Sequence, residues 1–316
     1  MDVPIGVVVP PDLPAPEFVR FAQEVDRLGF DELWIVEDCF LNGGVAQAAV
    51  ALAVTSRVRV GMGILPAGAR NAAFASMDIA TLSALFPGRI IVGIGHGMPR
   101  WMRQVGSWPE SPLTLLSEYI SAVKALLAGA LVTTHGRYVN LHDVQLASPP
   151  AVVPPVYSGV RGPKSLAVSG RVADGTILAE PVTPEYLQAV RRQIGVDRAH
   201  HKLATYNIAA VDTSVDGARE LARHNLSWVG EPDWAPHILP LPFASEFAEM
   251  RQKAASRESF AADLPPEWVD QLAVAGTPEV ARTRLAALAA AGADHLILIP
   301  SGPAPFTMLS SLARVL

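Results

Sequence analysis

The stretch RVRVGMGILPAGARNAAFASMDIATLSALFPGRIIVGIG, residues 57–95, decides the fold. Two apolar, β-branched runs at 57–65 and 89–95 are separated by an Ala/Leu-rich segment at 73–85 with helical character. Near-continuous apolar strands on either side of a helix are typical of a parallel sheet that is covered on both faces. The stretch therefore predicts a strand–helix–strand unit.

The same unit recurs along the whole chain. We predict the other strands at 4–9, 32–37, 155–159, 175–180, 204–211 and 295–300. We predict the other helices at 16–29, 45–56, 113–129, 163–172, 184–194, 214–226 and 278–292. Eight such units favour an α/β fold of the (β/α)₈ TIM-barrel type, with an open doubly wound sheet as the structural alternative.

Two stretches interrupt the repeat. Residues 130–150 alternate like a short strand pair, and residues 227–276, rich in Trp, Pro and Phe, suggest a helical insertion. No Gly/Ser-rich linker divides the chain. We therefore expect a single domain over residues 1–316, with insertions after the fourth and seventh strands.

Composition narrows the classes of function. The chain has 316 residues, a net charge of −5 and no long Lys/Arg run, so a nucleic-acid partner is not expected. The longest apolar run, at 46–54, is far shorter than the roughly 20 residues that span a bilayer. The single Cys39 excludes an internal disulfide and a multi-cysteine metal site. We expect a soluble, cytoplasmic protein that holds no metal.

Candidate site residues follow from the barrel rule that active sites lie at the carboxyl ends of the strands. Asp38, His96 and Glu180 each stand at such an end. Asp38 either bonds a ligand or caps the next turn, and His96 is either a hydrogen-bonding group or acid for a ligand or a structural histidine. The glycines of GIGHG, 93–97, leave room for a flat ring or a phosphate against the strand end.

The loop SGVRGPKS, residues 158–165, carries the clearest ligand signal. Gly159 and Gly162 allow the backbone to approach an anion, and Pro163 opens a helix whose free N–H groups would point at it. Arg161 and Lys164 add positive charge. The alternative is an ordinary Gly-Pro loop that leads into a helix.

Glycine inside the strand at 57–65 raises a separate question. Gly61 and Gly63 offer no side chain to pack, and glycine within a strand usually marks a bulge or a close approach to the backbone. We therefore expect some group to lie against this strand.

Several segments together resemble the bacterial-luciferase-like flavin and deazaflavin oxidoreductases, in particular the branch similar to methylenetetrahydromethanopterin reductase. The segments that carry the resemblance are LGFDELWIVED (28–38), residues 60–97, SPLTLLSEYISAVKALLAG (111–129), PPVYSGVRGPKSLAVSGRVADGTIL (154–178) and GTPEVARTRLAALAAAGADHLIL (276–298). Their order and spacing cover most of the chain.

The resemblance implies an enzyme, a homodimer, that binds coenzyme F420 or FMN and a small organic substrate. It implies a bulge with a non-prolyl cis peptide at Gly63 and Ile64 beneath the ring. It also implies a ligand-binding surface made by Gly95, His96, Gly97, Gly159, Val160, Arg161 and Gly162, with Asp38 and His96 near the reacting edge. Relatives often have Asp-His where this chain has Asp38-Cys39, so their proton chemistry does not transfer directly.

Three functions remain open at this point. The leading hypothesis is an F420-dependent oxidoreductase that transfers a hydride to or from an organic substrate. The second is an FMN-dependent monooxygenase that uses O₂ and a separate flavin reductase. The third is a barrel that binds a flavin without catalysis.

Overall fold

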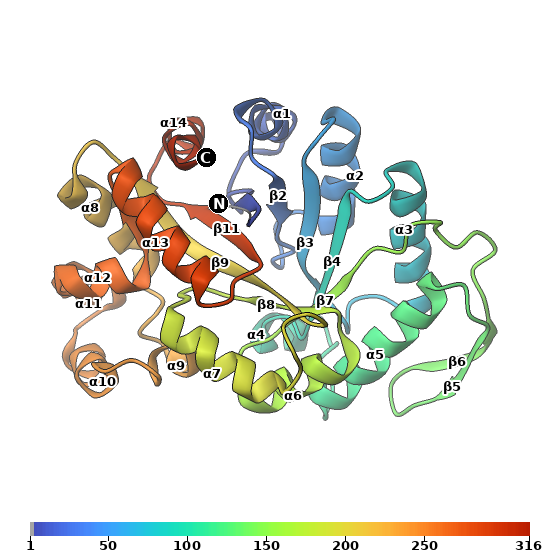
Figure 1. The fold of residues 1–316 in the computed structure, drawn as a ribbon. Coiled ribbons are helices and arrows are strands. Elements are labelled where there is room, and N and C mark those ends of the chain that lie inside the picture. Colours follow the sequence, from blue (N-terminus) through green and yellow to red (C-terminus); the bar gives the residue numbers. More distant parts are fainter. Residues whose placement is uncertain (1–2) are drawn as a thin grey trace.

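The chain folds into a closed barrel of eight parallel strands in the computed structural model, which describes residues 3–316 (Figure 1). The strands are β1 Ile5–Val8, β2 Glu32–Ile35, β3 Arg59–Pro66, β4 Ile90–Gly95, β7 Val156–Gly159, β8 Gly175–Leu178, β9 Lys202–Val211 and β11 His295–Pro300. Their order around the barrel is β9-β11-β1-β2-β3-β4-β7-β8, and β8 pairs with β9 to close it. The barrel prediction is confirmed and the open-sheet alternative is wrong.

Helices surround the barrel, as the strand–helix repeat predicts (Figure 1). They are α1 Phe18–Leu28, α2 Gly44–Val54, α3 Ala72–Leu85, α5 Pro112–Leu127, α6 Pro163–Val172, α7 Pro184–Ile194, α8 Val215–Leu226 and α13 Pro278–Ala290. Shorter pieces that were not predicted are η1 Ala15–Glu17, α4 Pro99–Gln104, α14 Pro305–Leu312 and η3 Ala313–Val315. Within residues 3–316, no helix is both long enough and apolar enough to cross a membrane.

The first insertion is an antiparallel hairpin of β5 Val132–His135 and β6 Asn140–Val144. It is fastened to α5 by Glu118, whose carboxylate accepts backbone N–H groups of Arg137 at 2.9 Å, Tyr138 at 2.9 Å and Val139 at 3.0 Å. Three backbone donors on one carboxylate hold the turn. These hydrogen bonds favour the charged form of Glu118 by more than burial disfavours it, so the pKa of Glu118 is lowered.

The second insertion is a helical unit whose core is shared with β9 and α8. It contains η2 Pro232–Trp234, α9 Ala235–Ile238, α10 Ala244–Lys253, α11 Arg257–Asp263 and α12 Pro266–Leu272. Phe243 stacks on Trp268 at 4.7 Å, and Phe247 meets Phe260 edge-on at 5.1 Å. A short strand, β10 Val274–Gly276, then adds to the outer part of β9 and returns the chain to the barrel.

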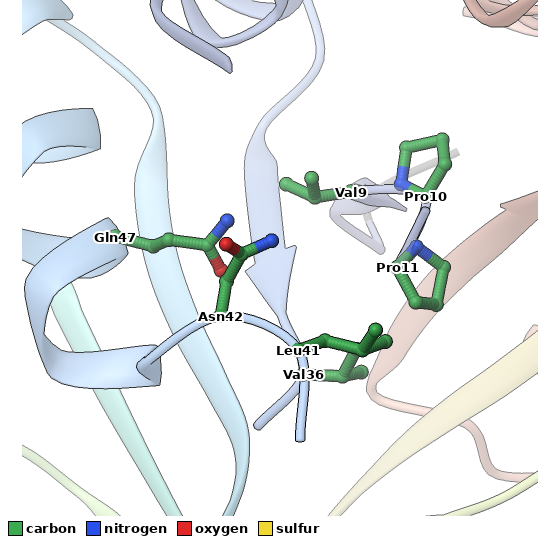
Figure 2. A pocket seen from close by; sticks show the side chains of 7 residues that line it. All are labelled: Val9, Pro10, Pro11, Val36, Leu41, Asn42 and Gln47. Carbon is green, nitrogen blue, oxygen red and sulfur yellow. The ribbon is translucent and has the colours of Figure 1, made fainter. Parts of the chain in front are cut away.

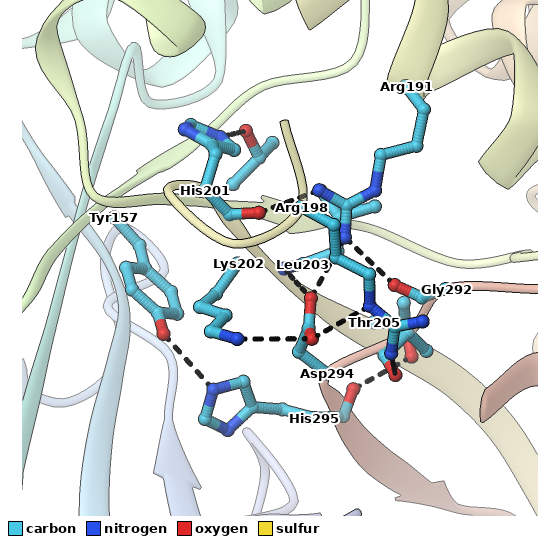
Figure 3. Close-up of polar contacts among 12 residues, drawn as sticks. Tyr157, Arg191, Arg198, His201, Lys202, Leu203, Thr205, Gly292, Asp294 and His295 are labelled. Atoms are coloured by element: carbon cyan, nitrogen blue, oxygen red, sulfur yellow. Dashed lines mark hydrogen bonds and ion pairs between the residues drawn. The ribbon is translucent and has the colours of Figure 1, made fainter. Parts of the chain in front are cut away.

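Charged groups close the amino end of the barrel. Glu32 is fully buried and accepts hydrogen bonds from Trp34 Nε1 and His295 Nδ1, both at 2.8 Å, and from the Arg59 guanidinium. His295 Nε2 in turn lies 3.1 Å from the Tyr157 hydroxyl (Figure 3). Beside it, Asp294 binds Arg191 at 2.9 Å and Arg198 at 3.2 Å (Figure 3). With this end filled by paired charges, the open end of the barrel is the carboxyl end of the strands.

Candidate active site

The middle of the barrel interior is filled by large side chains. Trp34 and Tyr206 meet edge-on with ring centroids 5.8 Å apart, inside a buried apolar cluster. The other buried members of this cluster are Val8, Ile91, Tyr157, Ile177, Ala204 and Ile297. This layer forms the floor of the carboxyl-end mouth.

Strand β3 carries the irregularity that the resemblance implied. Its register to β4 breaks between Met62 and Leu65, and the Gly63–Ile64 peptide is cis. The Tyr206 hydroxyl, on the strand diametrically opposite, donates to the Gly63 carbonyl at 3.1 Å. A hydrogen bond therefore spans the barrel and holds the bulge from inside.

The two glycines of β3 leave room for the two floor aromatics. A Cβ at Gly61 would lie 2.3 Å from the Trp34 ring, and a Cβ at Gly63 would lie 2.2 Å from the Tyr206 hydroxyl oxygen. What approaches this strand from the barrel interior is thus the protein's own Trp34 and Tyr206.

Ile64, raised by the bulge, explains two further glycines. A Cβ at Gly159 would lie 2.2 Å from Ile64 Cγ2, and a Cβ at Gly95 would lie 3.1 Å from two carbons of the same side chain. The atom nearest to a Cβ at Gly95 would be the Gly159 carbonyl oxygen, at 2.7 Å. The sequence suggested that these glycines admit a ligand. In the structure they make room for Ile64 and for the neighbouring strand, so their contact with a ligand stays a prediction.

His96 follows β4 and turns toward the loop after β7. Its Nε2 lies 3.2 Å from the hydroxyl of Ser165, in the first turn of α6. Burial lowers the pKa of the imidazole, which is therefore neutral at pH 7. This places His96 beside the predicted anion loop, with Gly97 next to it in a left-handed conformation at φ +70°.

The loop between β7 and α6 has the features of an anion cradle. Gly162 is the N-cap of α6 without a side-chain cap, and a Cβ there would meet nothing within 4 Å. The N–H groups of the first helical turn are free for a ligand, which is the usual basis of phosphate binding at a helix N-terminus. Val160, by contrast, is buried and packs into the core.

Arg161 is tied to the helical insertion. Its guanidinium donates to the Asp233 carbonyl at 3.3 Å and lies 4.7 Å from the centroid of the Trp234 ring. Its own carbonyl accepts the Tyr186 hydroxyl at 3.3 Å. The side chain that the sequence assigned to an anion therefore also joins the loop after β7 to the insertion.

His237 makes a second buried contact between the insertion and the barrel. It is completely buried, its Nδ1 donates to the Pro181 carbonyl at 3.0 Å, and its ring lies against Tyr186 with centroids 4.3 Å apart. Burial, reinforced by the nearby charge of Arg161, lowers the pKa of His237 to about 3. The insertion is thus fixed to the loops after both β7 and β8.

Two carboxyl groups stand beyond the carboxyl ends of strands. Asp38 stands three residues beyond β2 and Glu180 two residues beyond β8, and both are partly buried. Burial raises the pKa of Asp38, and burial together with the charge of Asp38 raises the pKa of Glu180. Arg161 opposes the shift at Glu180. The turn after Asp38 is closed by its backbone, where the Asp38 carbonyl accepts the Leu41 N–H at 2.8 Å.

The neighbouring Glu37 is a structural residue. Its carboxylate binds Arg70 through bonds of 2.6 and 2.8 Å and accepts the Gly44 N–H at 2.7 Å. It therefore connects the ends of β2 and β3 to the start of α2. At the rim nearby, a hollow between the ends of β1 and β2 has a cavity volume of about 10 Å³, which suits a single water molecule (Figure 2).

The structure thus brings the predicted site residues to one end of the barrel, and it adds residues that sequence reasoning missed. Tyr206, Trp34, Ser165 and His237 were not singled out, because an aromatic in a strand or a serine in a helix is usually a packing residue. The one available signal in the sequence was the pair of glycines in β3, because a glycine inside a strand indicates that a large group lies against it.

Comparison with known proteins identifies the family. A family model described as luciferase-like monooxygenase matches residues 4–295. A 5,10-methylenetetrahydromethanopterin reductase of Methanolobus tindarius is 26% identical over 311 residues, 94% of each chain. An F420-dependent glucose-6-phosphate dehydrogenase of Amycolatopsis mediterranei is 30% identical over 305 residues, 89% of this chain and 87% of the relative.

Structural comparison agrees with the fold. The coenzyme F420-dependent tetrahydromethanopterin reductase from Methanopyrus kandleri superposes with a TM-score of 0.84 at 20% identity, over 100% of this chain and 99% of that chain. The resemblance inferred from the sequence is confirmed, and with it the prediction of an oxidoreductase of this type. The barrel with its bulged third strand belongs to the luciferase-like monooxygenase family.

Proposed function

We propose that the protein is an oxidoreductase that uses coenzyme F420 to transfer a hydride to or from a small organic substrate. The observation that carries the proposal is the Gly63–Ile64 bulge, held from across the barrel by Tyr206 at the floor of an open mouth. Two relatives that match most of the chain, one of them named as F420-dependent, support this choice of coenzyme.

The residues present fit such a coenzyme. The bulge at Gly63 and Ile64 would support the ring, and Gly95 to Gly97 would line its side. The uncapped α6 N-terminus at Gly162, with Gly159, Val160, Arg161 and His96 beside it, would hold a phosphate. When bound, the reduced deazaflavin supplies a hydride from a ring carbon, and the protein contributes position and polar contacts, here from Asp38 and His96.

The floor has a direct role in this scheme. Trp34 and Tyr206 fill the interior beneath the bulge, so water cannot reach the ring from below. A ring-bearing ligand and its substrate must share the space above the floor, which brings the reacting atoms together.

The test is titration of the purified protein with F420 and with FMN, followed by ligand fluorescence. Saturable binding of F420 is expected. Binding of FMN alone would instead indicate the FMN-dependent monooxygenase supplied by a separate reductase. Binding of neither would contradict both proposals.

An Arg161 variant tests the proposed phosphate site in the same titration. Arg161→Ala should weaken F420 binding by about tenfold to a hundredfold, because a charge-assisted contact to a phosphate is worth roughly 1.5–3 kcal/mol. Arg171→Ala is the matched control, since Arg171 lies on the same helix but in its exposed last turn. Equal affinity in the two variants would remove Arg161 from the phosphate site.

We also propose that the protein is a homodimer. Helices α2 and α3 expose apolar side chains that a monomer would leave in water, namely Val50 at 40%, Phe74 at 67%, Met77 at 53% and Leu85 at 66% exposure. Large apolar side chains exposed in this number are typical of a subunit interface. The family resemblance implies that a second copy of the same chain covers these side chains.

A further inference from the structure

The helical insertion contains a hollow that the proposed coenzyme site does not use. It lies between α10 and the segment of η2 and α9, and its cavity volume is about 410 Å³. Ligand pockets usually have volumes of about 300–1,000 Å³, so this hollow is large enough for a small molecule. Most of its lining is apolar, including Val229, Ile238, Leu239, Phe247 and Ala248.

The segment of η2 and α9 separates the hollow from the barrel mouth. Ala235 and Leu239, within and directly after α9, line the hollow. Other side chains of the same segment face the barrel: the centroid of the Trp234 ring lies 4.7 Å from the guanidinium carbon of Arg161, and His237 bonds the loop after β8. A molecule in the hollow would therefore leave the anion loop and the bulge free.

Positive charge predominates at one wall of the hollow. Arg251 donates to Glu231 Oε1 at 2.8 Å, and Arg257 Nε lies 3.9 Å from the same oxygen. The guanidinium carbon of Arg257 also lies 3.6 Å from the centroid of the Trp228 ring. Two guanidinium groups thus share one carboxylate, which leaves one positive charge uncompensated within this cluster.

Arg251 is held at this wall by the packing of its aliphatic stem. A Cβ at Gly230 would lie 2.5 Å from Arg251 Cδ, so the glycine makes room for the arginine side chain. The Arg251 Nε atom is buried and has no hydrogen-bond partner within residues 3–316. A buried donor without an acceptor is destabilising, and a ligand that brings an acceptor removes this cost.

A second hollow, on the other side of α10, has the opposite charge. Its cavity volume is about 360 Å³, and its charged lining residues are Glu246, Glu249, Asp263 and Lys253. Lys253 lies 3.4 Å from Glu249, so two carboxylates remain uncompensated among these lining residues. Of the two hollows beside α10, the one at Arg251 is therefore the one that suits an anion.

We propose that the hollow between α9 and α10 binds an apolar molecule that carries a single carboxylate, such as a fatty acid. Its apolar body would lie against Val229, Ile238 and Phe247, and its carboxylate would accept hydrogen bonds from Arg251. This site is apart from the coenzyme and its substrate, so the proposal holds whichever coenzyme the barrel uses.

Isothermal titration calorimetry with dodecanoate tests the proposal. We expect saturable binding to the wild type, and no binding of the cation dodecyltrimethylammonium. Ala248→Trp should abolish the binding of dodecanoate, because Ala248 is an exposed residue of α10 that lines the hollow and the indole would fill the space. Arg251→Met should weaken it by about tenfold or more, because a hydrogen bond between two charged groups is lost.

A change at Glu231 should act in the other direction. Glu231→Gln frees both guanidinium groups for the ligand, so dodecanoate should bind about twofold to fivefold more tightly. A variant that had lost its fold could not bind more tightly. Glu249→Gln is the matched control, because it removes the same charge from the other side of α10, and its affinity should stay within about twofold of the wild type.

Three results of the calorimetry would overturn the proposal: no binding of dodecanoate to the wild type, equal binding of dodecanoate and dodecyltrimethylammonium, or unchanged binding in Ala248→Trp. Displacement of dodecanoate by F420 or by FMN would place it in the barrel mouth, which also contradicts the proposal. If light scattering shows a dimer for the wild type and a monomer for Ala248→Trp, the hollow receives a second copy of the chain, and the proposal is wrong.

Discussion

At the scale of single residues, the site is shaped by large side chains that occupy the space beside glycines. Tyr206 and Trp34 occupy the space that Gly63 and Gly61 leave, and Ile64 occupies the space at Gly159. Tyr206 with Gly63 and Ile64 with Gly159 join strands that are not consecutive in sequence, whereas Trp34 and Gly61 are partners on the consecutive strands β2 and β3. The shape of the floor is therefore set by a few complementary large and small residues.

Tyr206→Phe should destabilise the protein by about 1–3 kcal/mol, because the buried Gly63 carbonyl loses its donor. It should also weaken F420 binding, since the bulge is no longer held from across the barrel. Tyr157→Phe is the control, because its hydroxyl bonds His295 at the closed end. Denaturant unfolding should show a comparable loss in both, with weaker binding in Tyr206→Phe alone; equal binding would contradict the role of Tyr206.

Gly159→Ala should cost about 1–3 kcal/mol through overpacking against Ile64. Adding Ile64→Ala to it should recover part of the loss, which a double-mutant cycle measures directly. Gly162→Ala, in open space, should leave the free energy of unfolding nearly unchanged. Additive effects at 159 and 64 would show that the two residues do not compete for the same volume.

At the scale of elements, the helical insertion is attached through a buried cluster that it shares with β9, β10 and α8, and through contacts with the loops after β7 and β8. Asp233 and Trp234 engage Arg161, and His237 engages Pro181. Its aromatic residues belong to a buried cluster that also contains Ile208 and Ala210 of β9 and side chains of α8. The insertion is therefore packed on the outside of the barrel as well as held by these contacts.

Acid should destabilise the buried contact that His237 makes with the loop after β8. The pKa of this buried imidazole is about 3, below its ordinary value, so the unfolded chain binds the proton more readily. The stability contribution is complete above the unfolded value of about 6.5 and is lost as pH falls toward 3, at up to about 1.4 kcal/mol per pH unit. His237→Phe should be less stable at pH 7 but should lose less stability between pH 6 and pH 4. An identical pH slope in both proteins would exclude His237 as its cause.

At the scale of the whole molecule, the repeated strand–helix unit made the architecture predictable. All eight barrel strands and the long helices that connect them follow from apolar runs and their spacing, whereas α14 after the last strand does not. The anion loop at 158–165 was also visible, because glycines, a proline and basic residues are adjacent in sequence. Local signals of this kind need no tertiary information.

What the sequence could not show is which distant residues meet. Gly159 suggested a ligand, but the space beside it is filled by Ile64 from β3. Arg161 suggested a free cation, but residues more than seventy positions away engage it. The hydrogen bond from Tyr206 to Gly63 depends on barrel closure, which places β3 and β9 opposite each other.

Replacing Phe74 and Met77 by Glu should convert the proposed dimer into a monomer, because both side chains are exposed on α3 and lie outside the site. Size-exclusion chromatography with light scattering measures the change, and circular dichroism confirms that the fold is kept. Val280→Glu, at an exposed apolar position on α13, is the control. A wild-type protein that runs as a monomer at micromolar concentration would contradict the proposal.

The core that the insertion shares with β9 and α8 has a consequence for how such proteins diversify. A segment exchanged between relatives must match the buried surface of β9 and α8, and must also present a ring to the Arg161 guanidinium and a donor to the Pro181 carbonyl. Changes within residues 227–273 are therefore expected to be inherited together with matching changes on β9 and α8, while the floor, the bulge and the anion loop stay the same.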